Sequence, residues 1–387
     1  MNKGFSSVLN ISRWVAALLV VVHHVRHLVL ADLNDVANAG LLTKAFYFWT
    51  GLGHEAVVVF FVVSGLLVGA LTLEKWRLGK ANGVFDYLAH RFSRIYIVFI
   101  PALAVGYGLD YMGLLAFDNA QLYSNSYQYH TISLDTIIKD NLSIEVLLGN
   151  LFMLQKVCVS VLGSNGPLWS LAFEWWYYIL WILCIAIIFM RGIRQWLSAA
   201  LLIVLLAALP WEILLWMNIW LLGVATYYYG RSNWPKPSPW LSFGLFVVAL
   251  VVSRQSTHYF NQVNTVFINP HFIRDFGLGL VFSVFLASCS QLSQPFRGDA
   301  LHTKLAGFSY SLYLVHFPAM VFLVAASHQL LNSGFLLQPS FKAYSYFMLC
   351  VVVLCVYGYL FSLVTEKHTF KLVKLLKSIG VGRVWQV

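Results

Sequence analysis

Residues 18–30 read LLVVVHHVRHLVL, an apolar run that carries three histidines and one arginine. Its valines and leucines are typical of a membrane helix, in which polar side chains are costly and usually mark a site. The run belongs to a longer apolar segment, 8–30, which is long enough to cross a bilayer. No small-residue cleavage site follows, so we expect a retained helix rather than a signal peptide. The stretch therefore predicts a polar site within a membrane.

The rest of the chain has the composition of a polytopic membrane protein. Of its 387 residues, 60% are hydrophobic and only 10% are charged, and the mean hydropathy is +0.74, whereas soluble domains carry about 25% charged residues. We expect an all-α integral membrane protein with about ten transmembrane helices in one domain, 1–387. The mixed segment 116–166 is expected to be a re-entrant or surface-lying lid. The apolar segments are 8–30, 54–73, 92–115, 167–190, 196–210, 211–229, 240–253, 276–291, 305–330 and 343–365.

Positive charges predict the orientation of these segments. With ten crossings, 18 of the 25 lysines and arginines fall on one side and seven on the other. Cytoplasmic loops carry the excess of such residues, so both termini are expected to be cytoplasmic. The net charge of +10 then reflects orientation, and nucleic acid is not expected as a partner. Four C-terminal lysines at helical spacing are expected to face anionic lipid headgroups: Lys367, Lys371, Lys374 and Lys377.

The first candidate site lies on the first apolar segment. Arg13 and His24 are eleven positions apart, which returns to within about 20° of one helix face after a rise of roughly 16 Å. His27 lies near that face at the outer mouth, and His23 points elsewhere. A lone membrane histidine is often a hydrogen-bonding group between helices, but an arginine on the same face favours a functional site.

The second candidate site is the stretch NGPLWSLAFEWWYY, 165–178. Ser170, Glu174 and Tyr177 share one helical face. Counted from the outer side, Glu174 lies about as deep as His24, and a carboxylate beside an imidazole raises its basicity, as a general base requires. A pair kept for packing alone is the alternative. The tryptophans of the stretch are most simply an interfacial belt: Trp169, Trp175 and Trp176.

Two further stretches carry polar faces. In FSYSLYLVHFP, 308–318, Ser309, Tyr313 and His316 fall on one face and form either a wall of a polar cavity or ordinary contacts between helices. In HRFSRIY, 90–96, Arg91 and Arg94 lie one turn apart at the cytoplasmic entrance of a helix. Paired guanidinium groups suit phosphate recognition, although membrane orientation alone also explains them. The five cysteines have no metal-type or redox-type pairing, and no metal is expected.

Taken together, these stretches resemble acyltransferase family three, the integral-membrane O-acyltransferases that use acyl-CoA to modify bacterial cell-surface glycans. The resemblance covers almost the whole chain, and its motifs occur in the order of the family. The spacing of ten residues between arginine and histidine selects His24 as the catalytic histidine. The matching segments are SRWVAALLVVVHH (12–24), EAVVVFFVVSGLLVG (55–69), HRFSRIY, PLWSLAFEWWYYIL (167–180), FSYSLYLVHFP and TEKHTFKLVK (365–374).

The resemblance implies a multi-pass enzyme of the bacterial inner membrane. An acyl group, acetyl by default, would pass from cytoplasmic acyl-CoA to a hydroxyl of a cell-surface or lipid-linked glycan. His24, supported by Glu174, would act as the base or carry the acyl group briefly, and Arg13, Arg91 and Arg94 would hold coenzyme A. Residues expected to support the substrates are Ser64, Trp169, Ser170, Tyr177, Ser309, Tyr310, Tyr313 and His316.

The chain also departs from the family pattern. The proline that usually follows the arginine pair comes later, as Pro101, and no fused extracytoplasmic SGNH-like domain is expected. Other readings of the polar faces are a transporter or flippase for a polar lipid or glycan, a membrane scaffold or sensor, and a different acyltransferase fold. Binding of coenzyme A separates the enzyme from the transporter.

Overall fold

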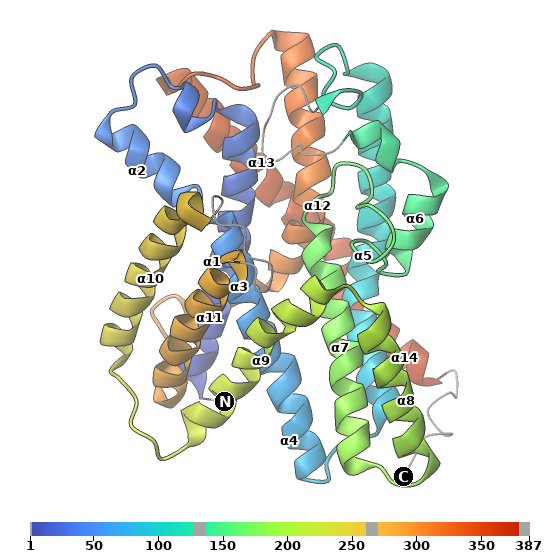
Figure 1. Cartoon of the computed structure of the whole chain (residues 1–387). Helices are drawn as coiled ribbons and strands as arrows, with labels where there is room; N and C mark the ends of the chain where they lie inside the picture. Colours follow the sequence, from blue (N-terminus) through green and yellow to red (C-terminus); the bar gives the residue numbers. More distant parts are fainter. Residues whose placement is uncertain (1, 127–136, 261–269, 379–387) are drawn as a thin grey trace.

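The computed structural model describes residues 2–126, 137–260 and 270–378. Within these ranges the chain is helical, with two isolated β-bridges and no sheet, which confirms the all-α prediction (Figure 1). In a bilayer every backbone polar group must be paired within the protein, and a helix does this inside each span. The helices are α1 (Lys3–Val29), α2 (Leu41–Trp49), α3 (Gly53–Ser64), α4 (Leu71–Arg77), α5 (Val84–Ala116), α6 (Ile144–Leu151), α7 (Leu168–Phe189), α8 (Ile193–Ala208), α9 (Trp211–Arg231), α10 (Pro239–Phe260), α11 (Pro270–Ser288), α12 (Asp299–Leu331), α13 (Phe341–Val364) and α14 (Thr369–Ser378).

The described ranges contain eight or nine candidate membrane spans rather than ten. The difference lies in α8 and α9, which were expected to cross separately but are bent by 118° at a break that contains Pro210. With 16 residues, α8 is about 24 Å long, too short for a hydrocarbon core of about 30 Å.

The pair α8–α9 starts and ends at the same end of the bundle. The ring of Trp76 in α4 packs 5.9 Å from Phe189, the last residue of α7. The end of α9 lies there too, because Arg231 Nη1 is 4.0 Å from Glu74 Oε1 of α4. This geometry is that of a re-entrant pair, and it keeps the alternation of the other spans unchanged.

The end where α1 begins and α4 ends is the lower end in Figure 1 and is called so below. The C-terminal helix α14 also lies toward this end and packs against α5. Lys377 forms an ion pair with Asp86 and lies 3.3 Å from His90 Nε2, so it contacts α5. The other three C-terminal lysines are exposed.

A close backbone crossing joins α3 to α9. A Cβ at Gly65 would lie 1.8 Å from the carbonyl oxygen of Trp220, and one at Gly223 would lie 2.0 Å from that of Val62. Only glycine permits this approach, and the helix widens into a π-helical turn, Gly65–Ala70, at the crossing. The crossing brings the indole of Trp220 within hydrogen-bonding distance of Ser64, at 3.1 Å.

The segment before α7 folds into the upper end of the bundle. Asp110 of α5 is 1% exposed and accepts hydrogen bonds from Ser164 N at 2.7 Å and Ser164 Oγ at 2.8 Å. Asn165 Nδ2 donates to the carbonyl oxygen of Leu314 in α12 at 2.8 Å. The predicted lid, 116–166, therefore enters the helix bundle over its last residues, whereas 127–136 lies outside the described residues.

Candidate active site

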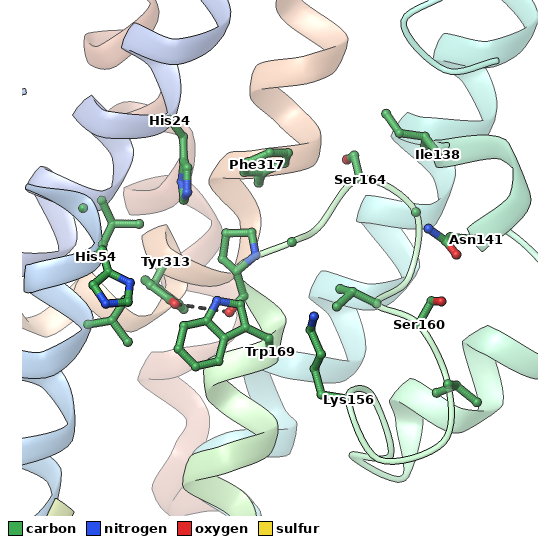
Figure 2. A pocket seen from close by; sticks show the side chains of 18 of the residues that line it. His24, His54, Ile138, Asn141, Lys156, Ser160, Ser164, Trp169, Tyr313 and Phe317 are labelled. Atoms are coloured by element: carbon green, nitrogen blue, oxygen red, sulfur yellow. Dashed lines mark hydrogen bonds between the residues drawn. The ribbon is translucent and has the colours of Figure 1, made fainter. Parts of the chain in front are cut away.

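Two cavities lie one above the other between α1, α3, α7 and α12. The lower cavity, of about 400 Å³, carries the polar side chains Arg13, Ser64, Arg91, Arg94, Ser170, Glu174, Tyr178, Ser309, Tyr310 and Tyr313. The upper cavity, of about 560 Å³ (Figure 2), carries His23, His24, His54, Asn141, Lys156, Ser160, Ser164, Trp169 and Tyr313. Val57 and Tyr313 line both cavities, so the two meet at these residues.

The three predicted arginines converge on the lower cavity. Arg94 Nη2 pairs with Glu366 Oε1 at 3.2 Å, and Glu366 Oε2 accepts from Ser311 Oγ at 3.1 Å. The Nε of Arg91 is buried and has no hydrogen-bond partner among the described residues. A guanidinium nitrogen that is buried without a partner fits an anionic ligand, and the apolar walls formed by α3 leave room for its uncharged part.

A chain of hydrogen bonds fixes Glu174 in the lower cavity. Trp220 Nε1 donates to Ser64 Oγ at 3.1 Å, Ser64 Oγ lies 3.2 Å from Tyr178 Oη, and Tyr178 Oη donates to Glu174 Oε1 at 2.6 Å. Because the carboxylate accepts only, the hydroxyl groups must all donate toward it. The chain holds Glu174 among the arginines.

Glu174 therefore does not occupy the place beside His24 that its depth in the sequence predicted. The depth was counted as if α7 began at the outer surface. In the structure the segment before α7 already enters the bundle, so Glu174 lies lower than expected and belongs to the other cavity. The partner of His24 comes from α12 instead.

Four aromatic residues of α7 also differ from prediction. Tyr177 is fully buried against Phe61 and Trp220 and lines neither cavity, while its neighbour Tyr178 reaches Glu174. Trp175 packs against Tyr96 with a centroid distance of 5.4 Å, and Trp176 Nε1 donates to the carbonyl oxygen of Met153 at 2.9 Å. They and Trp169 face protein contacts or the upper cavity rather than forming a belt.

His24 and His316 form a directed pair. His316 Nδ1 lies 2.8 Å from the carbonyl oxygen of Tyr313 and 3.1 Å from that of Leu312, so it carries the proton. His316 Nε2 then accepts from His24 Nδ1 at 2.9 Å. This assignment leaves the Nε2 of neutral His24 with a free lone pair, and the side chain points into the upper cavity (Figure 2).

His23 and His27 lie the other way round from the prediction, which placed His27 near the face of His24 and His23 away from it. His23 lines the upper cavity, whereas His27 is 5% exposed and bonds to Arg26. The end of α1 is covered by Tyr47 of α2 rather than open to the outside. The Arg26 guanidinium lies 5.0 Å from the Tyr47 ring centroid, and Tyr47 Oη donates to the carbonyl oxygen of Ala31 at 2.9 Å.

Tyr313 separates the two cavities. Its Oη lies 2.6 Å from Ser170 Oγ and 3.2 Å from the carbonyl oxygen of Pro167 (Figure 2). Ser309 and Tyr310 lie on the lower side of this point, and the ring of Tyr310 stands 5.9 Å from the Arg94 guanidinium. The face predicted for the stretch 308–318 is thus a cavity wall.

Several site residues were not identified from the sequence. His54 lines the upper cavity and bonds to Asp275 at 2.9 Å, and Lys156 enters from the segment before α7. Asp110 anchors that segment. The buried carboxylate of Asp110 inside the apolar segment 92–115 was the available signal, whereas nothing local in the sequence marks Lys156.

The arrangement can bring a base and an anionic donor together. An anionic cosubstrate held by the arginines of the lower cavity would extend toward Tyr313, above which His24 presents a free nitrogen lone pair. Within the described ranges no group of three or more His, Cys, Asp and Glu side chains is placed to hold a metal ion. The geometry suits proton transfer at a group that passes between the cavities.

Comparison with known proteins agrees with this arrangement. A family model for an acyltransferase domain, that of acyltransferase family 3, matches residues 7–365. No curated protein and no solved structure matches the chain. The matched range includes both cavities and every predicted site residue. The chain is a multi-pass membrane protein that belongs to acyltransferase family 3.

Proposed function

We propose that this acyltransferase moves an acyl group, acetyl by default, from cytoplasmic acyl-CoA to a hydroxyl of a cell-surface or lipid-linked glycan. The observation that carries the proposal is the position of His24, whose free Nε2 faces the upper cavity directly above an arginine-lined lower cavity. One cavity suits an anionic donor, and the other suits an uncharged hydroxyl that must lose a proton.

The proposed orientation places the lower end in the cytoplasm of a bacterium, with the protein in its inner membrane. Lys75 and Arg77 at the end of α4 lie at this end, as do both termini of the helical bundle. An excess of lysine and arginine is typical of the cytoplasmic side. Acyl-CoA would then enter the lower cavity, and the glycan would enter the upper cavity from the opposite side.

The charge of the lower cavity and its apolar wall support coenzyme A as the donor. Its phosphates would bind Arg13, Arg91 and Arg94, since guanidinium groups bind phosphate by paired hydrogen bonds. The orphaned Nε of Arg91 supports this. The pantetheine arm would run along the apolar wall of α3 toward Tyr313, and Glu174 would act as a positioning residue for the arginines through Tyr178 and Ser64.

The chemical step follows from the histidine pair. His24 Nε2 takes the proton of the acceptor hydroxyl while the hydroxyl oxygen bonds to the thioester carbonyl carbon. When the carbon–sulfur bond breaks, the thiolate of coenzyme A takes that proton from His24, so the products are an ester and a free thiol. His316 keeps His24 in the reactive tautomer and stabilises its positive charge. In the alternative route His24 Nε2 first bonds to the thioester carbon and expels the thiolate of coenzyme A. The acceptor hydroxyl then takes the acyl group from His24, and its proton goes to the thiolate.

The test uses membranes that contain the full chain, radiolabelled acetyl-CoA and the surface glycans of the host. We expect label in the glycan with wild type and with the control His328→Ala, because His328 lines neither cavity. We expect no label with His24→Ala, while that variant still inserts and binds coenzyme A. Equal labelling with His24→Ala would contradict the assigned base. If wild type transfers no label from any acyl-CoA, the transporter reading takes its place.

A further inference from the structure

Lys156 stands at the tip of a turn that the fold holds in a costly conformation. Its φ is +64°, a left-handed value that is unfavourable for a residue with a side chain. Lys156 N donates to the carbonyl oxygen of Val159 at 3.0 Å. Gln155, which is fully buried, donates through Nε2 to the carbonyl oxygen of Leu168 at 3.1 Å and so fixes the turn to the start of α7. The position of Lys156 is therefore set by the surrounding fold.

The turn directs the ammonium group into the upper cavity. Figure 2 shows the Lys156 side chain rising beside the indole of Trp169, below Ser164 and across the cavity from His24. No aspartate or glutamate is among the described residues that line this cavity. The nearest carboxylate behind this wall, that of Asp110, is already occupied by Ser164 N and Oγ, so the Lys156 ammonium is the charged group that faces the cavity itself.

The wall behind His23 adds a second positive charge. The Arg254 guanidinium packs so close to Gly51 that a Cβ there would lie 2.5 Å from Nη2, and His23 fills the corresponding space at Gly53. In the same wall the carboxylate of Asp275, which His54 contacts, is already paired with Arg274 at 2.9 Å. Clefts lined by one sign of charge between apolar walls concentrate ligands of the opposite sign.

We propose that the upper cavity selects acceptors with an anionic oxygen group and that Lys156 is the residue that recognises it. The group is a carboxylate of an acidic sugar or a phosphate in the glycan chain. The indole of Trp169 lies beside Lys156 and below His24 (Figure 2). A sugar ring would stack on it while one hydroxyl meets His24 and the anionic group meets Lys156. This inference rests on the proposed function and names the acceptor class for it.

The experiment measures binding of four soluble probes to the full chain in lipid nanodiscs by NMR titration. The probes are methyl glucuronide, methyl glucoside 6-phosphate, methyl glucoside and methyl glucosaminide. We expect the two anionic probes to bind about 5–10-fold more tightly than neutral methyl glucoside, since a lysine pairs with them. Methyl glucosaminide, whose amine is positively charged, should bind most weakly. The better of the two anionic probes identifies carboxylate or phosphate as the natural group.

Variants assign the preference to Lys156. Lys156→Met is expected to remove the preference for anionic probes, and Lys156→Arg is expected to keep it. Lys139→Met is the matched control, because Lys139 is an exposed lysine of the same segment that does not line the cavity. Equal binding of neutral and anionic probes to wild type, a preference that survives in Lys156→Met, or binding of no probe overturns the inference. Acyl transfer is scored separately, so an anion preference without transfer contradicts the proposed function alone.

Discussion

The two cavities of this protein are built in different ways. The charged groups of the lower cavity lie on regular helices, α1, α5 and α7. Glu366, from the short segment between α13 and α14, pairs with one of them. The upper cavity takes half of its wall from the segment before α7, which Asp110 and Gln155 tie to the bundle. Under the proposed function, donor binding would be a property of the helical frame, whereas acceptor choice would be a property of the segment before α7.

Among the residues that support His24 and coenzyme A, the largest effect is expected for His316→Phe. The change removes the acceptor for His24 Nδ1, so His24 loses its fixed tautomer and its support as a cation, and turnover should fall about 100–1,000-fold. Steady-state rates at saturating acyl-CoA and direct binding of coenzyme A measure the two properties separately. A variant that retains most of its turnover, or that loses coenzyme A binding to the same extent, would show that the cavities are not distinct.

Arg91→Met tests the lower cavity. We expect the dissociation constant of coenzyme A to rise about 10–100-fold, because a charge-assisted hydrogen bond contributes about 1.5–3 kcal/mol. Calorimetry in nanodiscs measures it. The matched control is Arg191→Met, since Arg191 is exposed and lines neither cavity. If Arg91→Met binds coenzyme A with unchanged affinity, the assignment of coenzyme A to the lower cavity is wrong.

Asp110→Ala tests the segment that completes the upper cavity. Loss of the carboxylate leaves Ser164 N–H unpaired in a buried place, which costs roughly 1–3 kcal/mol, and the loosened wall should raise the KM for the acceptor about 10-fold. The KM for acyl-CoA should stay constant. Asp118→Ala is the comparison, because Asp118 binds Tyr123 N at 2.7 Å and Ser124 N at 3.2 Å without lining the cavity. Similar kinetic effects in both variants would contradict a specific role of Asp110.

The smallest effect is expected for Tyr178→Phe. It breaks the hydrogen-bond chain between Ser64 and Glu174. Loss of this one neutral donor to a carboxylate should raise the KM for acyl-CoA about 3–10-fold. Tyr177→Phe should change nothing measurable, because the Tyr177 hydroxyl has no hydrogen-bond partner among the described residues and lines neither cavity. The reverse order of the two effects would place the functional face of α7 one residue earlier.

Much of the lower cavity could be predicted from the sequence. Helical spacing places Arg91 and Arg94 on one face. Because each helix spans the membrane, Arg13 near the start of α1 lies at the same depth as these two arginines on α5. The face of Ser309 and Tyr313 is a cavity wall for the same reason. Local periodicity suffices wherever a regular helix carries the side chain.

The rest depended on tertiary structure. Glu174 was placed too high because nothing in the sequence shows that the segment before α7 enters the bundle. Ten spans were expected, but the described part of the chain holds eight or nine, because α8 and α9 turn back at Pro210. Lys156 reaches its cavity through a turn fixed by contacts with Val159 and Leu168, and such contacts leave no periodic pattern.

The most direct test of the account is a crossed measurement on His24→Ala and Arg91→Met in identical nanodiscs. For each variant one measures the dissociation constant of coenzyme A and the transfer rate at saturating acyl-CoA. The account predicts that His24→Ala binds coenzyme A like wild type but transfers no label, and that Arg91→Met binds it weakly but transfers at nearly the wild-type rate once saturated. If His24→Ala weakens coenzyme A binding as much as Arg91→Met does, the assignment of donor binding and chemistry to separate cavities is contradicted.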